Sequence, residues 1–214
     1  MKKTVAVLGL GIFGSSIAKK LCEFDCDVIA VDMDIDNVER VGHLVDQAIQ
    51  ADFTHYEALE EIGLGVCDIA VIGTSRNLES AILGVLNCKK LGIKTVIAKA
   101  KNKTYMDILY RIGADRVIRP EKDSGTRLAQ ELAAPTILDQ INLDDRYNIY
   151  ELVAPKAWVG KSLAELDLRN KYGINLIGFK SSGIFEVQYD AQTKFNSGDI
   201  VVFIGDKDSV KSIV

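Results

Sequence analysis

The sequence has no excess of basic residues, since 26 lysines and arginines stand against 30 aspartates and glutamates for a formal net charge of −4. Proteins that bind nucleic acid or anionic membranes through general electrostatics carry surplus positive charge. Proline is scarce too, with 3 residues beside 17 glycines in a chain of 214, far from disordered or collagen-like composition. We therefore expect a folded globular protein with no nucleic-acid partner.

Long apolar runs are also missing. None approaches the roughly 20 residues that span a bilayer, and Met1-Lys2-Lys3 leads into Thr4–Gly9 without a signal-cleavage pattern. We expect a cytoplasmic protein with no direct membrane insertion.

Cysteine and histidine are few and scattered. The four cysteines form no CxxC pair, and neither of the two histidines stands in a Cys/His cluster. These residues are Cys22, Cys26, Cys67, Cys88, His43 and His55. We expect free, buried thiols; a metal site, a disulfide and a Cys-His nucleophilic pair are the alternatives.

Six short apolar runs have the length of strands buried on both faces of a sheet. They lie at Val5–Leu8, Val28–Val31, Gln47–Gln50, Asp68–Ile72, Val96–Ala98 and Arg116–Ile118. Apolar residues at helical spacing occur in Phe13–Phe24, Tyr56–Ile62 and Leu78–Leu91. This alternation predicts an α/β fold, a Rossmann-like parallel sheet with helices on both faces.

The pattern changes after Pro120. A helix is expected from about Glu121 to Ala134, with Leu128 and Leu132 inward and its end before Pro135. Short strands are then expected at Ile149–Val153, Asn175–Phe179, Ile184–Val187 and Ile200–Ile204, with short helices at Ser162–Leu166 and Asp206–Ile213. We predict two domains, a Rossmann domain at residues 1–135 and a small α+β domain at 136–214. So small a domain commonly depends on an oligomeric partner.

The run Gly9-Leu10-Gly11-Ile12-Phe13-Gly14 lies between the first expected strand and the first helix. Its glycines permit a tight turn, close approach of a pyrophosphate and close packing of strand on helix, while the helix N-terminus offers free N–H groups to phosphate. The second strand ends at Asp32, where a carboxylate accepts from a ribose hydroxyl. These residues predict a nucleotide site; a Rossmann-like glycine turn with an empty pocket is the alternative.

Polar residues follow other strands at the same predicted edge. Asp52 follows the third strand, Gly73–Asn77 follows the fourth, and Lys99 closes the fifth. Asp52 is suited to accept from an adenine amino group and Lys99 to meet a phosphate. Taken singly, each of these residue types is more often a solvated loop residue, but their shared place at one edge of the sheet favours a ligand site.

At this point the chain resembles a known family, the cytosolic regulator-of-potassium-conductance (RCK) subunits of Trk/Ktr-type potassium transporters. The resemblance covers essentially the whole chain and rests on Gly9–Gly14, Asp32, Lys99–Asn102, Arg111–Asp115, Pro120–Asp123, Asp167–Arg169 and Tyr172–Asn175. It implies an N-terminal nucleotide-binding RCK domain and a smaller C-terminal RCK domain. It also implies a homodimer that assembles into an octameric ring beneath a membrane-embedded Trk/Ktr potassium channel subunit, at the inner face of the plasma membrane.

The resemblance further implies ligands. The N-terminal site would take ATP, ADP, AMP or NAD(H), and a divalent or sodium ion would lie near Glu121 at the dimer seam; a first-turn helix residue is the alternative for Glu121. The implied nucleotide contacts are Gly9, Gly11, Ile12, Phe13, Gly14, Asp32, Asp52 and Lys99.

One position departs from many members of the family, which carry an arginine where this chain has Ile12. Isoleucine cannot sense a terminal phosphate by hydrogen bond or charge. The loop is similar to that of cyclic di-AMP-binding streptococcal relatives, which implies cyclic di-AMP at the C-terminal dimer. The implied contacts are Leu163, Asp167, Leu168, Arg169, Ile174 and Asn175. An exposed salt bridge between Asp167 and Arg169 is the alternative reading.

The function expected from the sequence is a regulatory, nucleotide-binding gating subunit and not an enzyme. A Rossmann-type NAD(P)-dependent oxidoreductase is one alternative, although no acid/base constellation is evident around His43 or His55. A free-standing nucleotide sensor is the other.

Overall fold

The computed structural model describes residues 2–74, 77–133, 137–211 and 213. Two compact units make up the chain, Met1–Lys122 and Asp123–Val214. The expected domain boundary between residues 135 and 136 lies outside the described residues, as does Pro135. Within the described part of the chain, no helix is both long enough and apolar enough to cross a bilayer.

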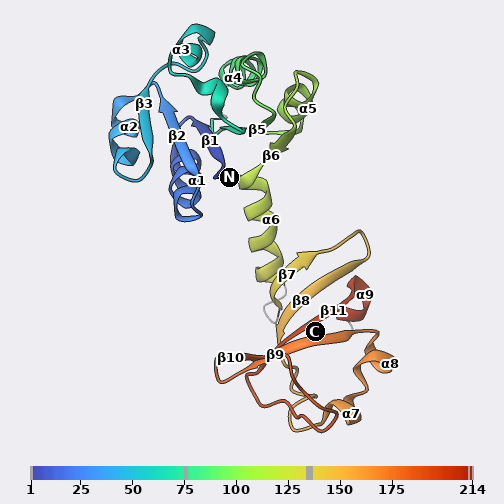
Figure 1. Cartoon of the computed structure of the whole chain (residues 1–214). Coiled ribbons are helices and arrows are strands. Elements are labelled where there is room, and N and C mark those ends of the chain that lie inside the picture. The colour runs from blue at the N-terminus through green and yellow to red at the C-terminus, as the bar shows by residue number, and fades with distance from the viewer. Residues whose placement is uncertain (1, 75–76, 134–136, 212, 214) are drawn as a thin grey trace. The chain divides into compact units, whose positions relative to one another are not determined.

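Six parallel strands form one sheet in the first unit (Figure 1), in the order β3-β2-β1-β4-β5-β6. They are β1 (Thr4–Leu8), β2 (Asp27–Asp32), β3 (Gln47–Gln50), β4 (Ile69–Ile72), β5 (Thr95–Lys99) and β6 (Arg116–Ile118). The order reverses between β1 and β4, and in such sheets ligands bind beside the carboxyl ends of the strands at that reversal. The predicted Rossmann-like fold is confirmed.

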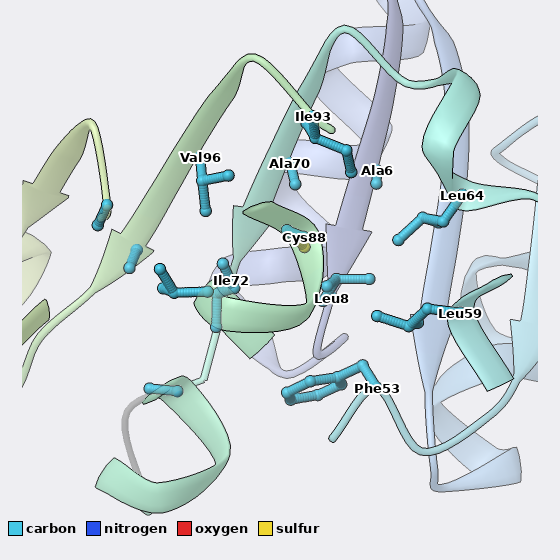
Figure 2. Close-up of a cluster of buried hydrophobic side chains, with 14 of the residues drawn as sticks. Ala6, Leu8, Phe53, Leu59, Leu64, Ala70, Ile72, Cys88, Ile93 and Val96 are labelled. Carbon is cyan, nitrogen blue, oxygen red and sulfur yellow. The ribbon is translucent and has the colours of Figure 1, made fainter. Parts of the chain in front are cut away.

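Helices cover both faces of this sheet because alternate residues of each strand point to opposite sides. The helices are α1 (Ile12–Glu23), α2 (Ile35–Gly42), α3 (Tyr56–Glu61), α4 (Leu78–Lys90) and α5 (Lys103–Arg111), with a short 3₁₀ turn, η1 (Leu64–Val66). Val5 and Val7 of β1 pack in the cluster that holds Ala18 of α1. Ala6 and Leu8 pack in the other cluster, beside Leu59, Leu64 and Cys88 (Figure 2). The sheet is therefore buried on both faces.

The second unit is built on an antiparallel sheet in the order β10-β9-β11-β8-β7. Its strands are β7 (Ile137–Asn142), β8 (Tyr147–Val153), β9 (Asn175–Ser181), β10 (Ile184–Glu186) and β11 (Ile200–Asp206). Its short helices are α7 (Leu163–Leu166), α8 (Leu168–Tyr172) and α9 (Lys207–Lys211). Trp158 and Phe195 stack in its core with ring centroids 6.1 Å apart. The α+β expectation is confirmed, and β7 and α8 are elements that the sequence analysis did not find.

One long helix, α6 (Pro120–Ala133), begins in the first unit and continues past its end at Lys122. Leu128 and Leu132 of this helix are 53% and 72% exposed. The prediction that they point inward is therefore wrong for the single chain. Their spacing identified an apolar stripe, but nothing in the described chain covers it.

The cysteines are free, as predicted, but only two of the four are buried. Cys67 and Cys88 lie in the core, whereas Cys22 and Cys26 are half-buried. The expectation of burial is therefore wrong for Cys22 and Cys26. They lie at the end of α1 and in the loop after it, packed against the rim of the core cluster beside that helix.

Candidate nucleotide site at the carboxyl edge of the sheet

The glycine loop joins β1 to α1, and it needs one glycine for its backbone conformation and another for close packing. Gly9 has a φ of +91°, which favours glycine, and a Cβ on Gly14 would lie 1.9 Å from the Gly9 carbonyl oxygen. A Cβ on Gly73, after β4, would lie 2.6 Å from the same oxygen. A Cβ on Gly11 would meet no atom within 4 Å. The backbone conformation and the packing of the protein itself thus explain Gly9 and Gly14, while Gly11 faces open space.

Two side chains hold the peptide of Leu10 in this loop. Oδ2 of Asp32 accepts a hydrogen bond from the Leu10 N–H at 2.5 Å, and its Oδ1 accepts from the Asp34 N–H at 2.9 Å. Arg40 of α2 donates to the Leu10 carbonyl oxygen at 2.9 Å. Asp32 is 8% exposed. Because a carboxylate has about four acceptor sites, Asp32 still has capacity for a ligand hydroxyl.

Asp52 follows β3 and is held by its own loop. Its Oδ1 accepts from the backbone N–H of Thr54 at 2.9 Å and from the Thr54 hydroxyl at 2.7 Å. Nε2 of His55 lies 3.6 Å from the other carboxylate oxygen. Burial raises the pKa of Asp52, but the hydrogen bonds from Thr54 outweigh burial and hold this pKa below its usual value. Asp52 is therefore an ionised acceptor beside the sheet edge.

Lys99 ends β5 and forms an ion pair with Glu121 in the first turn of α6. The distance from Nζ to Oε1 is 2.5 Å, and the Lys99 side chain is 12% exposed against 70% for Glu121. The Lys99 ammonium also lies 5.4 Å from the centroid of the Phe13 ring. The hydrogen bond from Lys99 lowers the pKa of Glu121. In the part of the chain that the structure describes, no group of three or more His, Cys, Asp or Glu side chains could hold a metal ion.

The loop residues Ile12 and Phe13 have different surroundings. Ile12 begins α1 and is 91% exposed, whereas Phe13 is half-buried beneath the Lys99 ammonium. No side chain caps the N-terminus of α1, so its free N–H groups remain available to an anion. Strand order places the glycine loop, Asp32, Asp52 and Lys99 along one edge. Ser75 and Arg76 lie outside the described residues.

The predicted C-terminal contacts surround the junction of α7 and α8. Asp167 has a φ of +45° at this junction, and its Oδ1 accepts from the Asn170 side-chain amide at 2.8 Å. Among the described residues no ion pair joins Asp167 to Arg169, and Arg169 is exposed. Asn175, the first residue of β9, is exposed as well.

The apolar residues predicted for that site divide by burial. Ile174 is fully buried and Leu168 is 7% exposed, so both pack in the core of the second unit. Leu163 is half-buried. In the single chain, Leu163 is therefore the most accessible of the three.

Sequence reasoning missed three features. It did not find the Arg40 contact or the Lys99–Glu121 pair, because both join segments far apart in the chain. It also missed a hollow of about 480 Å³ in the second unit, lined by Lys180–Gly183 and Asn196–Ile200. None of the predicted ligand contacts lines this hollow.

The fold and the loop define a Rossmann-type nucleotide-binding class of domain joined to a small antiparallel domain. Residues 5–120 match the TrkA-N domain family, and residues 149–214 match the TrkA-C domain family. The chain belongs to this TrkA family of regulatory RCK subunits of Ktr and Trk potassium uptake systems. The expectation of a regulatory subunit, and not an enzyme, is confirmed by these relatives.

Two relatives and one solved structure illustrate the similarity. The chain is 35% identical over 205 residues to Ktr system potassium uptake protein C of Bacillus subtilis (strain 168), covering 96% of this chain and 93% of that protein. It is 32% identical over 208 residues to Ktr system potassium uptake protein A of Vibrio alginolyticus, with coverages of 97% and 94%. The GsuK channel bound to NAD matches all of this chain with a TM-score of 0.65 and 15% identity, and the match spans 39% of the channel chain.

Proposed function

We propose that this chain is a nucleotide-responsive gating subunit of a Ktr/Trk-type potassium uptake system. The observation that carries the proposal is the glycine loop, whose Leu10 peptide is held by Asp32 and Arg40 while Gly11 faces open space at the carboxyl edge. Such a loop can receive a pyrophosphate without first being ordered, which lowers the cost of binding.

The ligand at this site is an adenine nucleotide, ATP, ADP, AMP or NAD(H). The uncapped start of α1 supplies N–H groups for phosphate, and Asp32 supplies an acceptor for ribose. Lys99 supplies positive charge beside Phe13. The GsuK channel, which is similar in fold, is bound to NAD, and this supports a nucleotide ligand for the present chain.

The test is isothermal titration of the full chain with ATP, ADP, AMP and NADH. Gly11→Asp should abolish binding, because its side chain would put bulk and negative charge where the phosphates approach. Gly125→Asp is the matched control, since a Cβ on this glycine also meets no atom within 4 Å. Equal affinity in wild type and Gly11→Asp would place the site elsewhere.

The regulatory unit is a homodimer that assembles into an octameric ring on a membrane-embedded Trk/Ktr channel subunit, at the cytoplasmic face of the membrane. The exposed Ile12 beside the glycine loop supports a neighbouring copy at this site. Nucleotides gate the channel only if they bind the open and closed rings with different affinity. A cation at Glu121 would have to compete with Lys99.

Residues 136–214 bind a second regulatory ligand, cyclic di-AMP, between two C-terminal domains. The exposed Arg169 offers a planar donor fork to a phosphate, and the exposed Asn175 offers both a donor and an acceptor. A two-fold symmetric ligand suits a two-fold seam, because one set of residues serves each half of it. Residues 1–135 bind the regulatory nucleotide at the glycine loop.

A further inference from the structure

Lys99 lies where the glycine loop and α6 come together at the carboxyl edge of the first unit. Its Nζ is 2.5 Å from Oε1 of Glu121 and 5.4 Å from the centroid of the Phe13 ring. Only 12% of its side chain is exposed. The positive charge that a phosphate would meet beside α1 is therefore already paired with a carboxylate.

This pairing affects different nucleotides to different extents. A dinucleotide has its phosphates esterified on both sides, whereas ATP and ADP end in a free phosphate group. A phosphate monoester carries a charge of about −1.5 to −2 at neutral pH, more than a diester does. A carboxylate beside Lys99 therefore weakens the binding of ATP more than it weakens the binding of a dinucleotide.

We propose that Glu121 is a specificity-determining residue of the nucleotide site, which weakens binding of nucleotides with a free terminal phosphate by keeping Lys99 engaged. This inference rests on the proposed nucleotide function. The terminal phosphate of ATP can pair with the Lys99 ammonium only if it displaces the Glu121 carboxylate. A dinucleotide binds through the glycine loop and Asp32 and leaves the ion pair in place.

The exchange has a consequence for α6. Glu121 lies in the first turn of this helix, which continues to Ala133 beyond the end of the first unit at Lys122. When a terminal phosphate takes Lys99, the ion pair that fastens the start of α6 to the end of β5 is lost. ATP and a dinucleotide therefore leave the start of α6 in different states.

The experiment compares the affinities of the full chain for ATP and NADH by calorimetry. In Glu121→Gln, the affinity for ATP should rise about tenfold while that for NADH changes by less than about twofold. Glu121→Asp keeps the charge and should keep a preference nearer to that of wild type. Glu61→Gln, an exposed position of α3, is the control for loss of one negative charge.

The outcomes separate the inference from the function on which it rests. If both nucleotides bind wild type but Glu121→Gln leaves the ratio of their affinities unchanged, the specificity role is overturned and the nucleotide site stands. The same holds if Glu61→Gln changes the ratio as much as Glu121→Gln. If neither nucleotide binds wild-type protein, the nucleotide function is overturned and the specificity role falls with it.

Discussion

Asp32 shows how one side chain serves both the fold and the site. Its two carboxylate oxygens each accept a backbone N–H, one from Leu10 in the glycine loop and one from Asp34. Arg40 completes the arrangement by donating to the Leu10 carbonyl oxygen. The residue type that suits a ribose hydroxyl is therefore also the one that orders the loop, and sequence alone showed only the first of these roles.

The two buried cysteines predict a specific pH dependence of stability. Burial raises the pKa of Cys67 to about 11 and that of Cys88 to about 12, from a usual value of 9.0. Above pH 9 the unfolded thiols lose their protons while the folded ones keep them, so the folded state binds more protons and its stability falls as pH rises.

Cys88→Ala should therefore show a shallower loss of stability over the first pH unit above 9, by up to about 1.4 kcal/mol. Denaturant unfolding of wild type and variant at several pH values measures this difference. The variant is less stable at every pH because it leaves a cavity, so only the slope is informative. Parallel slopes would contradict the raised pKa of Cys88.

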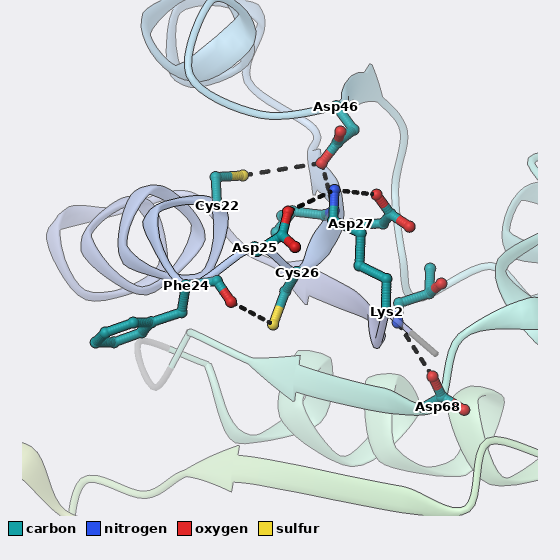
Figure 3. A network of polar contacts seen from close by, with 10 residues as sticks. Lys2, Cys22, Phe24, Asp25, Cys26, Asp27, Asp46 and Asp68 are labelled. Atoms are coloured by element: carbon teal, nitrogen blue, oxygen red, sulfur yellow. Dashed lines mark hydrogen bonds and ion pairs between the residues drawn. The ribbon is translucent and has the colours of Figure 1, made fainter.

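At the scale of elements, aspartates fasten the amino edge of the parallel sheet. Asp46, Asp68 and Asp115 each stand immediately before a strand and accept the backbone N–H of a residue at the start of the neighbouring strand. Figure 3 shows Asp46 and Asp68 in this role, near the Lys2 ion pairs with Asp25 and Asp27. These three carboxylates at the amino edge therefore stabilise the pairing of neighbouring strands.

Asp115 gives the sharpest test of this arrangement. It accepts from the Val96 N–H at 2.6 Å and from Nζ of Lys89 at 2.5 Å, so it joins β5, α4 and the start of β6. Asp115→Ala should lower the free energy of unfolding by about 1 to 3 kcal/mol, because both donors lose a charged acceptor. Asp107→Ala, an exposed position of α5, is the control in chemical denaturation. Equal stability of the two variants would contradict the role of Asp115.

Local patterns in the sequence predict the six strands of the parallel sheet. The strands Gln47–Gln50 and Arg116–Ile118 were predicted with the bounds that the structure shows. The local patterns did not locate α2, α5, α8 or β7. The helix α2 is short and largely polar, and β7 lies at the edge of its sheet with several exposed residues.

The site was predictable only in part, because local signals do not report contacts across the fold. The glycine pattern located the turn, since the backbone conformation of the chain requires Gly9 and its packing requires Gly14. The Lys99–Glu121 pair depends on the end of β5 lying beside the start of α6, which no spacing in the sequence reveals. The inward placement of Leu128 failed for the same reason, because periodicity finds an apolar stripe but not what covers it.

At the scale of the whole molecule, the exposed apolar stripe of α6 predicts association between copies. Leu128 and Leu132 are one helical turn apart, and both are more than half exposed. Leu132→Glu should shift the protein toward smaller assemblies, because it would place a charge in an apolar contact. Light scattering at micromolar concentration and physiological salt measures the change.

Phe24→Glu is the control for this experiment, since Phe24 is 69% exposed and lies in the first unit, directly after α1. Association should remain even-numbered and dimer-based in the control. A monomeric wild-type protein would contradict the assembly itself, and equal dissociation of both variants would remove α6 from the contact.

Assembly of the protein and binding of cyclic di-AMP are expected to depend on each other. If cyclic di-AMP binds between two C-terminal domains, its affinity depends on dimerisation, and by linkage the ligand must in turn stabilise the dimer. Arg169→Ala should weaken binding at least about tenfold, since charge-assisted contacts contribute about 1.5 to 3 kcal/mol each. It should leave nucleotide binding at the glycine loop unchanged.

Calorimetry on the full chain measures both ligands, with Lys180→Ala as a control for loss of one exposed positive charge in the same unit. Absence of saturable binding to wild-type dimers up to high micromolar ligand would leave the N-terminal nucleotide as the controlling input. An equal loss in Lys180→Ala would instead show that the attraction is general electrostatics and not a contact made by Arg169.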